Sequence, residues 1–501
     1  MDVIVHGDRA TVDAIAARYN LRVTKHLKSG GVLRVNAGQL AAVRDDGAFD
    51  HLSPDVPIYS SDVTTETIAA ERVWAGEGDL QQLTGSGIGV AVIDSGVDFG
   101  HAALRNRVAV SVDFTGGNGV DKFGHGTHVA ATVAGRQGRT PDTRDYRGVA
   151  SAARIINLRV LGDDGSGMAS NVIEAIDWAI EYRTRYNIKI INLSLGAPVT
   201  QPYRDDPLCE AAERAVAAGI VVVTAAGNYG QTQDGRRVFG SIASPGNDPN
   251  VVTVGALDAH ATSDRSDDTV ALYSSRGPTM FDLVMKPDIV APGSHVVSAE
   301  ASGSYLATHR PERHVAGTGE NAYIQLSGTS MATAVTSGIL ALLFDQKPSL
   351  SPNDAKVALQ VTSTLLTDEG LLASGAGSIN AYAAAEFVAG SYTAAMSLAL
   401  TDGASASESN FASDTVVHAQ DGAIRPTSTE RPRKIVFGTT THRGRLLLWG
   451  KTIAGDETFA WGRTLSIKPR DGHRPQRLIR FQGDDDDTIV WGSSDDDDTI
   501  V

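Results

Sequence analysis

Cysteine is almost absent from the sequence: Cys209 is the only one in 501 residues. A single cysteine excludes an intramolecular disulfide and a zinc site built from several thiolates. Cys209 stands in an alanine-rich helical pattern, where a thiol is more often buried than reactive. The chain must therefore be stabilised by its apolar core, for which its length is ample.

Long apolar runs and an excess of basic charge are also missing. No run reaches the length of a membrane-spanning helix, so no transmembrane segment is expected. The start, Met1-Asp2-Val3, lacks the basic residues and the apolar stretch of a signal peptide. From this start we expect a cytoplasmic protein or one whose signal has been removed. The net charge of −15 argues against nucleic acid as a partner.

The N-terminal residues, 1–60, have the pattern of a compact α+β unit. Apolar runs and helical periodicity follow the order β-α-β-β-α-β, which is the split βαβ or ferredoxin-like arrangement. The expected strands are 3–5, 21–27, 31–36 and 49–56, and the expected helices are 11–19 and 38–45.

Residues 61–389 have the pattern of an α/β domain. Continuous apolar runs, typical of strands buried on both faces, alternate with helical patterns. This alternation predicts a mostly parallel, doubly wound sheet between two layers of helices. The expected strands are 88–93, 155–161, 188–195, 220–225, 251–257 and 287–290. The expected helices are 68–74, 127–134, 168–183, 208–218, 329–346, 352–365 and 376–387.

The composition changes beyond this domain. Residues 390–430 are rich in Ser, Thr, Ala and Asp, which predicts a linker. Residues 431–501 contain short apolar runs that end in an aromatic residue and glycine, and we interpret them as a small β-repeat region. These runs are 435–438, 447–450, 459–462 and 489–492. Two runs of four aspartates, 484–487 and 495–498, lie near the C-terminus. We expect them to form either a solvated acidic tail or a weak calcium site.

Four motifs contain candidate catalytic residues. Ser330 lies between a glycine turn and a helical run, where a serine is either a helix cap or an exposed nucleophile. Asp94 ends a buried strand, where α/β sheets hold functional groups, although an isolated Asp there usually caps a turn. His125 and His128 flank a turn into a helix, but the third ligand that a metal would need is missing, so no metal is assigned. Asn228 ends another apolar strand.

Together these motifs resemble those of the subtilisin-like serine proteases, the subtilase family, in the order Asp, His, Ser. The resemblance covers about residues 60–388, and its motifs are Val90–Gly96, Gly124–Ala130, Thr224–Asn228 and Leu326–Ala332. It implies a triad of Asp94, His125 and Ser330, with Asn228 as the oxyanion donor. It further implies that protein and peptide substrates are hydrolysed through an acyl-enzyme, with no cofactor required for the chemistry.

The resemblance extends to a substrate groove. Two segments look like the family's edge segments, which pair with an extended peptide, and three small residues look like the lining of the pocket for the residue before the scissile bond. The edge segments are Gly165, Ser166 and Gly167, and Ser194, Leu195 and Gly196. The pocket residues are Ala225, Ala226 and Gly227, which favour a broad apolar pocket. Alternatively, Ser-Leu-Gly is only a strand that ends in a glycine turn.

The N-terminal unit resembles the family's propeptide, an intramolecular chaperone and inhibitor. The expected cleavage site is near Tyr59 and Ser60, and the cut tail would occupy the active site as a product. The alternative is a permanent accessory domain. The family resemblance also implies secretion, although this chain shows no signal peptide.

Two positions depart from the family pattern. Ala334 stands where most members have a proline, four residues after the nucleophile. This alanine either has no effect, or it relaxes the helix, shifts Ser330 slightly and changes the balance between hydrolysis and aminolysis of the acyl-enzyme. Residues 136–142, where the family has a calcium loop, are basic and lack a clear set of oxygen ligands. Structural calcium is therefore possible but not assignable.

We expect a serine endopeptidase that is made as a self-inhibited, autoprocessed precursor. Two alternatives remain open at this point. One is a transpeptidase or peptide ligase on the same scaffold, which Ala334 motivates. The other is a non-catalytic surface-binding protein that acts through the C-terminal repeats.

Overall fold

A computed structural model describes most of the first 391 residues and four short strands near the C-terminus. The described ranges are 2–27, 30–44, 46, 52–54, 64–138, 143, 146–232, 234–364, 366 and 369–391. The late strands are β16 (Thr439–His442), β17 (Arg445–Leu448), β18 (Ser466–Ile467) and β19 (Gln476–Arg477). The chain separates into two compact units, Met1–Ser61 and Asp62–Val501.

The first unit is a four-stranded antiparallel sheet with two helices. The sheet order is β2-β3-β1-β4, and each neighbouring pair is antiparallel. Its core is apolar and includes Val5, Val12, Ile15 and Leu33. The element order is the one expected from the sequence; of the last expected strand, 49–56, the described residues are 52–54, and they form β4. The elements are β1 (Asp2–His6), α1 (Arg9–Arg18), β2 (Arg22–Leu27), β3 (Gly30–Arg34), α2 (Ala37–Arg44) and β4 (Leu52–Pro54).

The second unit is built on an eight-stranded sheet of order β11-β10-β9-β8-β5-β7-β6, with β12 also paired to β10. Neighbouring strands are parallel except β10 and β11, so the prediction of a mostly parallel sheet is confirmed. The strands are β5 (Gly89–Asp94), β6 (Val108–Asp113), β7 (Arg154–Arg159), β8 (Ile188–Leu193), β9 (Val221–Ala225), β10 (Val252–Asp258), β11 (Thr269–Val270) and β12 (Ile289–Pro292).

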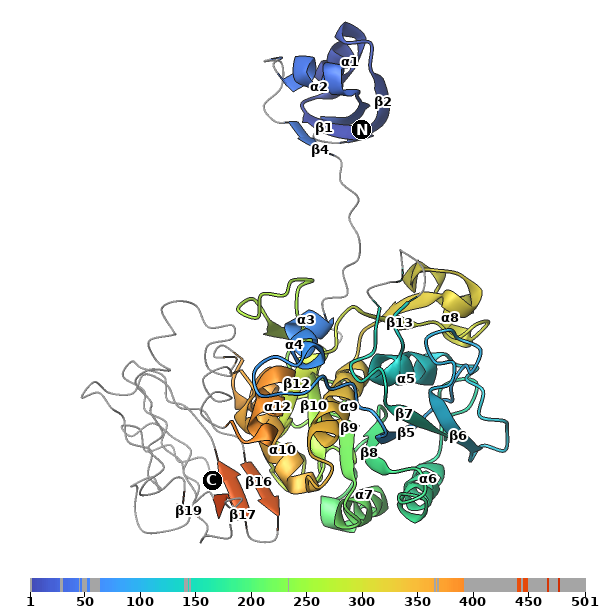
Figure 1. Ribbon diagram of the computed structural model, residues 1–501, viewed down its shortest axis with the longest axis vertical. Coiled ribbons are helices and arrows are strands. Elements are labelled where there is room, and N and C mark those ends of the chain that lie inside the picture. Colours follow the sequence, from blue (N-terminus) through green and yellow to red (C-terminus); the bar gives the residue numbers. More distant parts are fainter. Residues whose placement is uncertain are drawn as a thin grey trace, which may run out of the picture. The chain divides into compact units, whose positions relative to one another are not determined.

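Helices cover both faces of this sheet (Figure 1). Because successive strand side chains point to opposite faces, β5 packs Val90 and Val92 with α5 and α9, and Ala91 and Ile93 with α6 and α7. The helices are α3 (Thr64–Thr67), α4 (Ala70–Ala75), α5 (His125–Ala134), α6 (Ala169–Glu181), α7 (Pro207–Ala217), α8 (Tyr305–His309), α9 (Thr329–Gln346), α10 (Pro352–Val361), α11 (Leu371–Ser374) and α12 (Ala381–Ala389). Three 3₁₀ turns are η1 (Tyr203–Asp205), η2 (Pro311–Arg313) and η3 (Gly319–Asn321).

Helix α9 is the central helix of the unit and begins and ends where the sequence predicts. It is buried from Met331 to Phe344, and it lies against β8, β9 and β10. Small residues allow this close packing: a Cβ at Gly338 would lie 2.6 Å from the Cβ of Val149. Ala334 is fully buried in the same helix, which continues through it without interruption.

Several elements differ from the prediction. Strand β6 and the small sheet β13 (Val296–Ala299), β15 (Tyr323–Leu326), β14 (His314–Ala316) were not predicted. Helix α12 begins five residues later than expected, because the side chain of Asn380 accepts the N–H of Ala383 and so caps the helix there. The predicted helix 68–74 corresponds to α4 alone, which begins at Ala70 because Ala69, with a φ of 57°, is left-handed and separates α4 from α3.

The C-terminal predictions fall largely outside the described residues. The linker 390–430 lies outside them except for residues 390 and 391, and so do most of the expected repeats and both aspartate runs. In this region β16 pairs with β17, and β18 pairs with β19, in both cases antiparallel. The β-repeat region stays a prediction.

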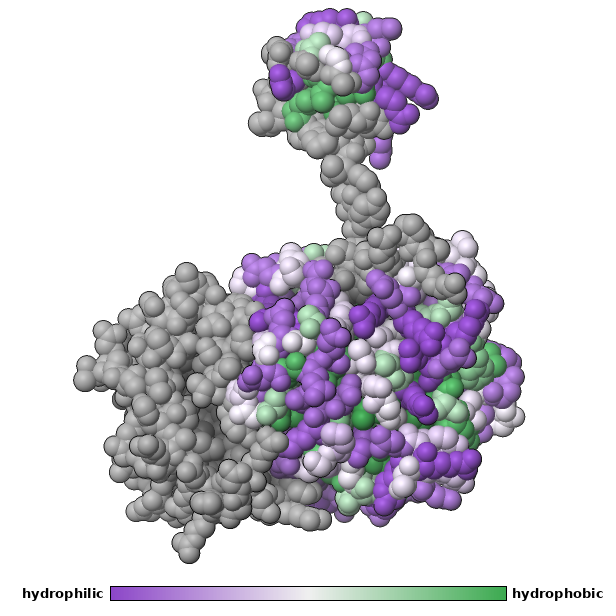
Figure 2. Space-filling view, viewed as in Figure 1, coloured by the Kyte–Doolittle hydropathy of each residue, from purple (hydrophilic) through white to green (hydrophobic). Residues whose placement is uncertain are grey.

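Hydrophilic residues predominate on the face of the second unit shown in Figure 2, where hydrophobic residues form small separate groups. Among the described helices, none combines the length and the apolar character that crossing a membrane requires.

Candidate active site

Three adjacent strands, β9, β8 and β5, end at one edge of the sheet, and three of the candidate residues lie at or just after these ends. Asp94 is the last residue of β5, Ser194 directly follows β8, and β9 leads through Ala226 and Gly227 to Asn228. Because the carboxyl ends of parallel strands meet at one edge, this is where α/β sheets bind ligands.

Asp94 and His125 are joined by a hydrogen bond. His125 is the first residue of α5, and its Nδ1 lies 2.8 Å from Oδ1 of Asp94. The Asp94 side chain is fully buried, and that of His125 is 18% exposed. A carboxylate accepts, so Nδ1 carries the proton and Nε2 is left as the basic nitrogen.

A second buried carboxylate, which the sequence analysis missed, fixes the turn before His125. Asp121 accepts the N–H groups of Gly124 and Thr127 and the hydroxyls of Thr127 and Ser95, at 2.6–2.9 Å. The Ser95 hydroxyl in turn accepts the N–H of Gly126. This network ties the start of α5 to the end of β5. The only sequence signal for it is an Asp four residues before His125.

The pKa of His125 is set by opposing effects. Burial lowers it, while the carboxylates of Asp94 and Asp121 raise it, and the result is a pKa above the ordinary value of 6.5. His128 behaves differently, because burial lowers its pKa to about 3. Its Nε2 lies 3.1 Å from the carbonyl of Val296, so His128 is a neutral, buried residue behind the site.

Ser330 and Ser194 are joined by two hydrogen bonds. The Oγ of Ser330 donates to the carbonyl of Ser194 at 3.0 Å, and the Oγ of Ser194 donates to the carbonyl of Ser330 at 2.8 Å. The Ser330 hydroxyl must therefore turn toward His125 to pass on its proton. Catalytic hydrogen bonds are often formed only when substrate is bound, so this geometry is compatible with a nucleophile.

Asn228 is oriented by the first residue of α9. Its Oδ1 accepts both the N–H and the hydroxyl of Thr329, each at 3.0 Å. With the oxygen occupied, the Nδ2 group is the end available to an oxyanion. A Cβ at Gly328 would lie 3.4 Å from Nδ2, so this glycine keeps the space beside the donor open.

A buried acid, an oriented base, a serine at a helix start and an amide donor are the components of acyl transfer. The Subtilase family model matches residues 85–378, which is more than half of the chain and includes all four of these residues.

The chain belongs to the subtilase family.

Two proteases and one solved structure are similar to this chain over most of their own length. Serine protease AprX of Bacillus subtilis (strain 168) is 38% identical over 338 residues, which cover 66% of this chain and 72% of AprX. Subtilisin E of the same strain is 30% identical over 376 residues, covering 75% of this chain and 81% of subtilisin E. The solved structure of Sphericase is 30% identical, with a TM-score of 0.49, over 64% of this chain and 99% of Sphericase. This subtilase is a subtilisin-like serine endopeptidase and hence a hydrolase.

The first expected edge segment of this subtilase, Gly165 to Gly167, lies on the returning arm of a hairpin turn that follows β7. Gly162 N–H donates to the carbonyl of Ser166 at 2.7 Å, and Leu161 pairs with Gly167. A Cβ at Gly165 would lie 2.6 Å from the ring of Phe123, so the turn packs against the loop before His125.

The second edge segment, Ser194 to Gly196, directly follows β8. Of the three expected pocket residues, Ala225 and Ala226 are buried and Gly227 is half-buried. The expected cleavage residues, Tyr59 and Ser60, lie outside the described residues.

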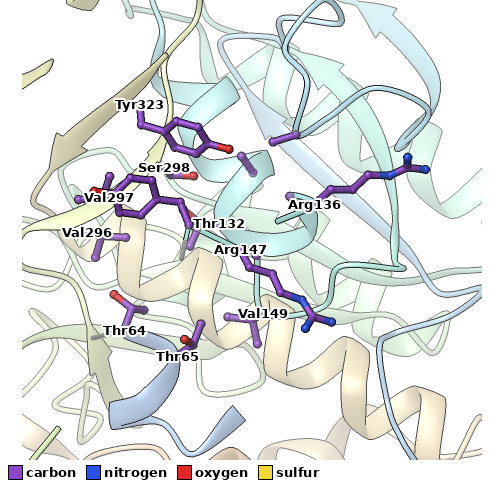
Figure 3. A pocket seen from close by; sticks show the side chains of 15 residues that line it. Thr64, Thr65, Thr132, Arg136, Arg147, Val149, Val296, Val297, Ser298 and Tyr323 are labelled. Carbon is purple, nitrogen blue, oxygen red and sulfur yellow. The ribbon is translucent and has the colours of Figure 1, made fainter. Parts of the chain in front are cut away.

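A small cavity lies away from this site, beside the later turns of α5 (Figure 3). Its volume is about 20 Å³, enough for one water molecule. Its lining includes Thr132, Arg147, Val297 and Tyr323 but none of the four candidate catalytic residues, so it is not the substrate site.

Subtilases need no cofactor for catalysis. Within the part of the chain that the structure describes, no three His, Cys, Asp or Glu side chains are grouped to hold a metal ion. Calcium is therefore not assigned to any residue.

The pKa of His125 leads to a test. If neutral His125 is the general base, kcat/KM should rise with pH through a midpoint above 6.5. Asp121→Asn removes one of the two charges that raise this pKa, so the acid limb should move to lower pH. The pH dependence of kcat/KM on a chromogenic peptide measures the shift.

A matched control is Asp177→Asn on α6, which removes the carboxylate of an exposed ion pair with Arg214 on α7. Its profile should coincide with that of the unaltered enzyme. An acid limb that stays in place in Asp121→Asn would contradict the electrostatic account.

Proposed function

We propose that this endopeptidase uses Ser330 as its nucleophile, His125 as general base, Asp94 to orient the imidazole and Asn228 to stabilise the oxyanion. The observation that carries the assignment is the 2.8 Å hydrogen bond between Asp94 and His125, at the sheet edge where Asn228 also lies. The family match over residues 85–378 supports it.

The reaction proceeds in two stages. His125 Nε2 takes the proton of Ser330 as Oγ attacks the peptide carbonyl, and the same proton then passes to the leaving amine. Asp94 stays ionised and stabilises the imidazolium. Water, activated by His125, then attacks the acyl-enzyme and releases the second product.

The carbonyl oxygen becomes negative in each stage. Asn228 Nδ2 and the backbone N–H of Ser330, near the start of α9, are the donors for it, and the helix dipole adds to their effect. Thr329 supports this role, because its two hydrogen bonds to Oδ1 fix which end of the amide faces the substrate.

The substrate would bind as an extended strand between the two edge segments, Gly165 to Gly167 and Ser194 to Gly196. Their positions after β7 and β8, on the two sides of β5, support this arrangement. The side chain before the scissile bond would enter a pocket lined by Ala225, Ala226 and Gly227, whose small size favours apolar residues.

We also propose that residues 1–60 are a propeptide that the enzyme removes by cutting near Tyr59 and Ser60. Support comes from the separate compact unit Met1–Ser61, its own apolar core and its position before the catalytic unit. Secretion, which the family resemblance implies, is part of this proposal.

The catalytic assignment predicts two different losses of activity. Ser330→Ala removes the nucleophile and should abolish hydrolysis of a protein substrate. Asn228→Ala removes one oxyanion donor and should lower kcat by about 10²–10³-fold with little change in KM, the loss seen for this kind of change in subtilisin. Steady-state kinetics on a peptide substrate measure both.

Ser327→Ala is the matched control. Ser327 is exposed, lies three residues before Ser330, and its Oγ accepts the N–H of His295 outside the site. Its kcat/KM should stay within about twofold of the unaltered enzyme, as for most exposed substitutions. Full activity of Ser330→Ala would disprove the assignment.

The propeptide proposal predicts self-cleavage. Intact-mass spectrometry of the incubated protein should show a cut near Tyr59–Ser60, and the Ser330→Ala variant should keep its full mass. An N-terminal sequence that still begins at Met1 in fully active enzyme would favour a permanent accessory domain instead.

A further inference from the structure

Both peptide groups that flank Asn228 are held by one buried serine from a distant segment. The N–H of Ser275 donates to the carbonyl of Gly227 at 2.9 Å, and the Oγ of Ser275 accepts the N–H of Tyr229 at 3.1 Å. Ser275 is fully buried, whereas Asn228 is exposed.

This contact has a direct geometric consequence. A residue has only two soft backbone angles, and they are fixed when the peptide planes on both sides of it are fixed. The direction of its Cα–Cβ bond then follows. Ser275 therefore determines where the side chain of Asn228 points, while Thr329 determines which end of the amide faces outward.

The surrounding packing leaves little freedom for another arrangement. Gly227 has a φ of 107°, and a Cβ there would lie 2.9 Å from the Oγ of Ser275, so the glycine lets the two segments approach. Farther along, the carbonyl of Gly230 accepts a hydrogen bond from Nη1 of the buried Arg276 at 2.9 Å. The segment 227–230 is thus held along its length by residues 275 and 276.

We propose that Ser275 is a positioning residue for the oxyanion donor, acting on the reaction only through Asn228. This inference rests on the proposed role of Asn228. In an oxyanion site the donor must already be in place when charge develops, because its value comes from preorganisation. A displacement of about 1 Å can cost as much as 10²-fold in rate.

A purely structural role is the alternative. Ser274 provides a matched comparison, since it is the neighbouring residue, is equally buried and also uses its Oγ as an acceptor. Its partner is the N–H of Ala256 in β10, not the segment that carries Asn228. Ser274→Ala and Ser275→Ala therefore each delete one fully buried Oγ. The first frees the backbone N–H of Ala256 in β10, and the second frees the N–H of Tyr229 beside Asn228.

The test is a double-mutant cycle on kcat and KM with one peptide substrate. Ser275→Ala should lower kcat by about 10-fold and leave KM nearly unchanged, because the oxyanion forms only in the transition state. In an Asn228→Ala background the same change should lower kcat by less than about 2-fold, since there is no longer a donor to position. Ser274→Ala should also lower kcat by less than about 2-fold, both in the unaltered enzyme and in the Asn228→Ala background.

Each other outcome has a defined meaning. If Ser275→Ala lowers kcat about equally in both backgrounds, or if Ser274→Ala reproduces its effect, the positioning role is wrong. If Asn228→Ala itself leaves kcat unchanged, the proposed function of Asn228 fails, which the single variant reveals independently of Ser275.

A second variant covers the case in which Ser275→Ala does not fold. Ser275→Cys keeps an atom at the position of Oγ but makes it a weaker acceptor. It should lower kcat by several-fold, and this loss should again vanish in the Asn228→Ala background. A loss that persists in that background overturns the proposal.

Discussion

The hydrogen bond between Asp94 and His125 is the interaction on which the rest of the site depends. It joins the last residue of a fully buried strand to the first residue of a helix. It forms only when the strand end and the helix start hold the two side chains at hydrogen-bond distance. Burial of Asp94 keeps its charge away from water, so its attraction for the imidazole is strong. The Asp121 network holds the strand end and the helix start in the same relative position, because Asp121 accepts backbone N–H groups on either side of His125. One half of the site is therefore rigid before substrate arrives.

The other half combines a fixed side chain, the proposed oxyanion donor, with a movable one, the proposed nucleophile. Thr329 and Ser275 fix the side chain and the backbone of Asn228. Ser330, one residue beyond Thr329, instead donates its hydroxyl to the carbonyl of Ser194, within an edge segment expected to pair with substrate. An arriving peptide N–H would compete for that carbonyl and leave the hydroxyl available to His125. In the proposed mechanism, the groups that stabilise charge are thus fixed in advance, whereas the group that forms the new bond has only a side-chain rotation to make.

The sequence allowed much of the fold to be predicted, because long apolar runs and helix boundaries are local signals. The ends of α9 and the buried strands β5 and β8 followed from such runs, and the long motifs around Asp94, His125, Asn228 and Ser330 indicated the family. Contacts between remote segments could not be predicted in this way. Ser275 lies 46 residues from Tyr229, and a serine in a polar run carries no sign of the backbone it will bind. Strand β6 and the sheet of β13, β14 and β15 were missed for a related reason, since short or half-exposed strands depend on neighbours that the local pattern does not reveal.

In the proposed mechanism Ser330 is the nucleophile, and His125 and Asp94 activate it. Reaction with a fluorophosphonate followed by peptide mapping tests it most directly, because the reagent phosphonylates only an activated serine. The account predicts one adduct per chain, located on Ser330, which forms more slowly as His125 becomes protonated and is lost in His125→Ala. An unlabelled but folded and active enzyme, or an adduct on another serine, would contradict it.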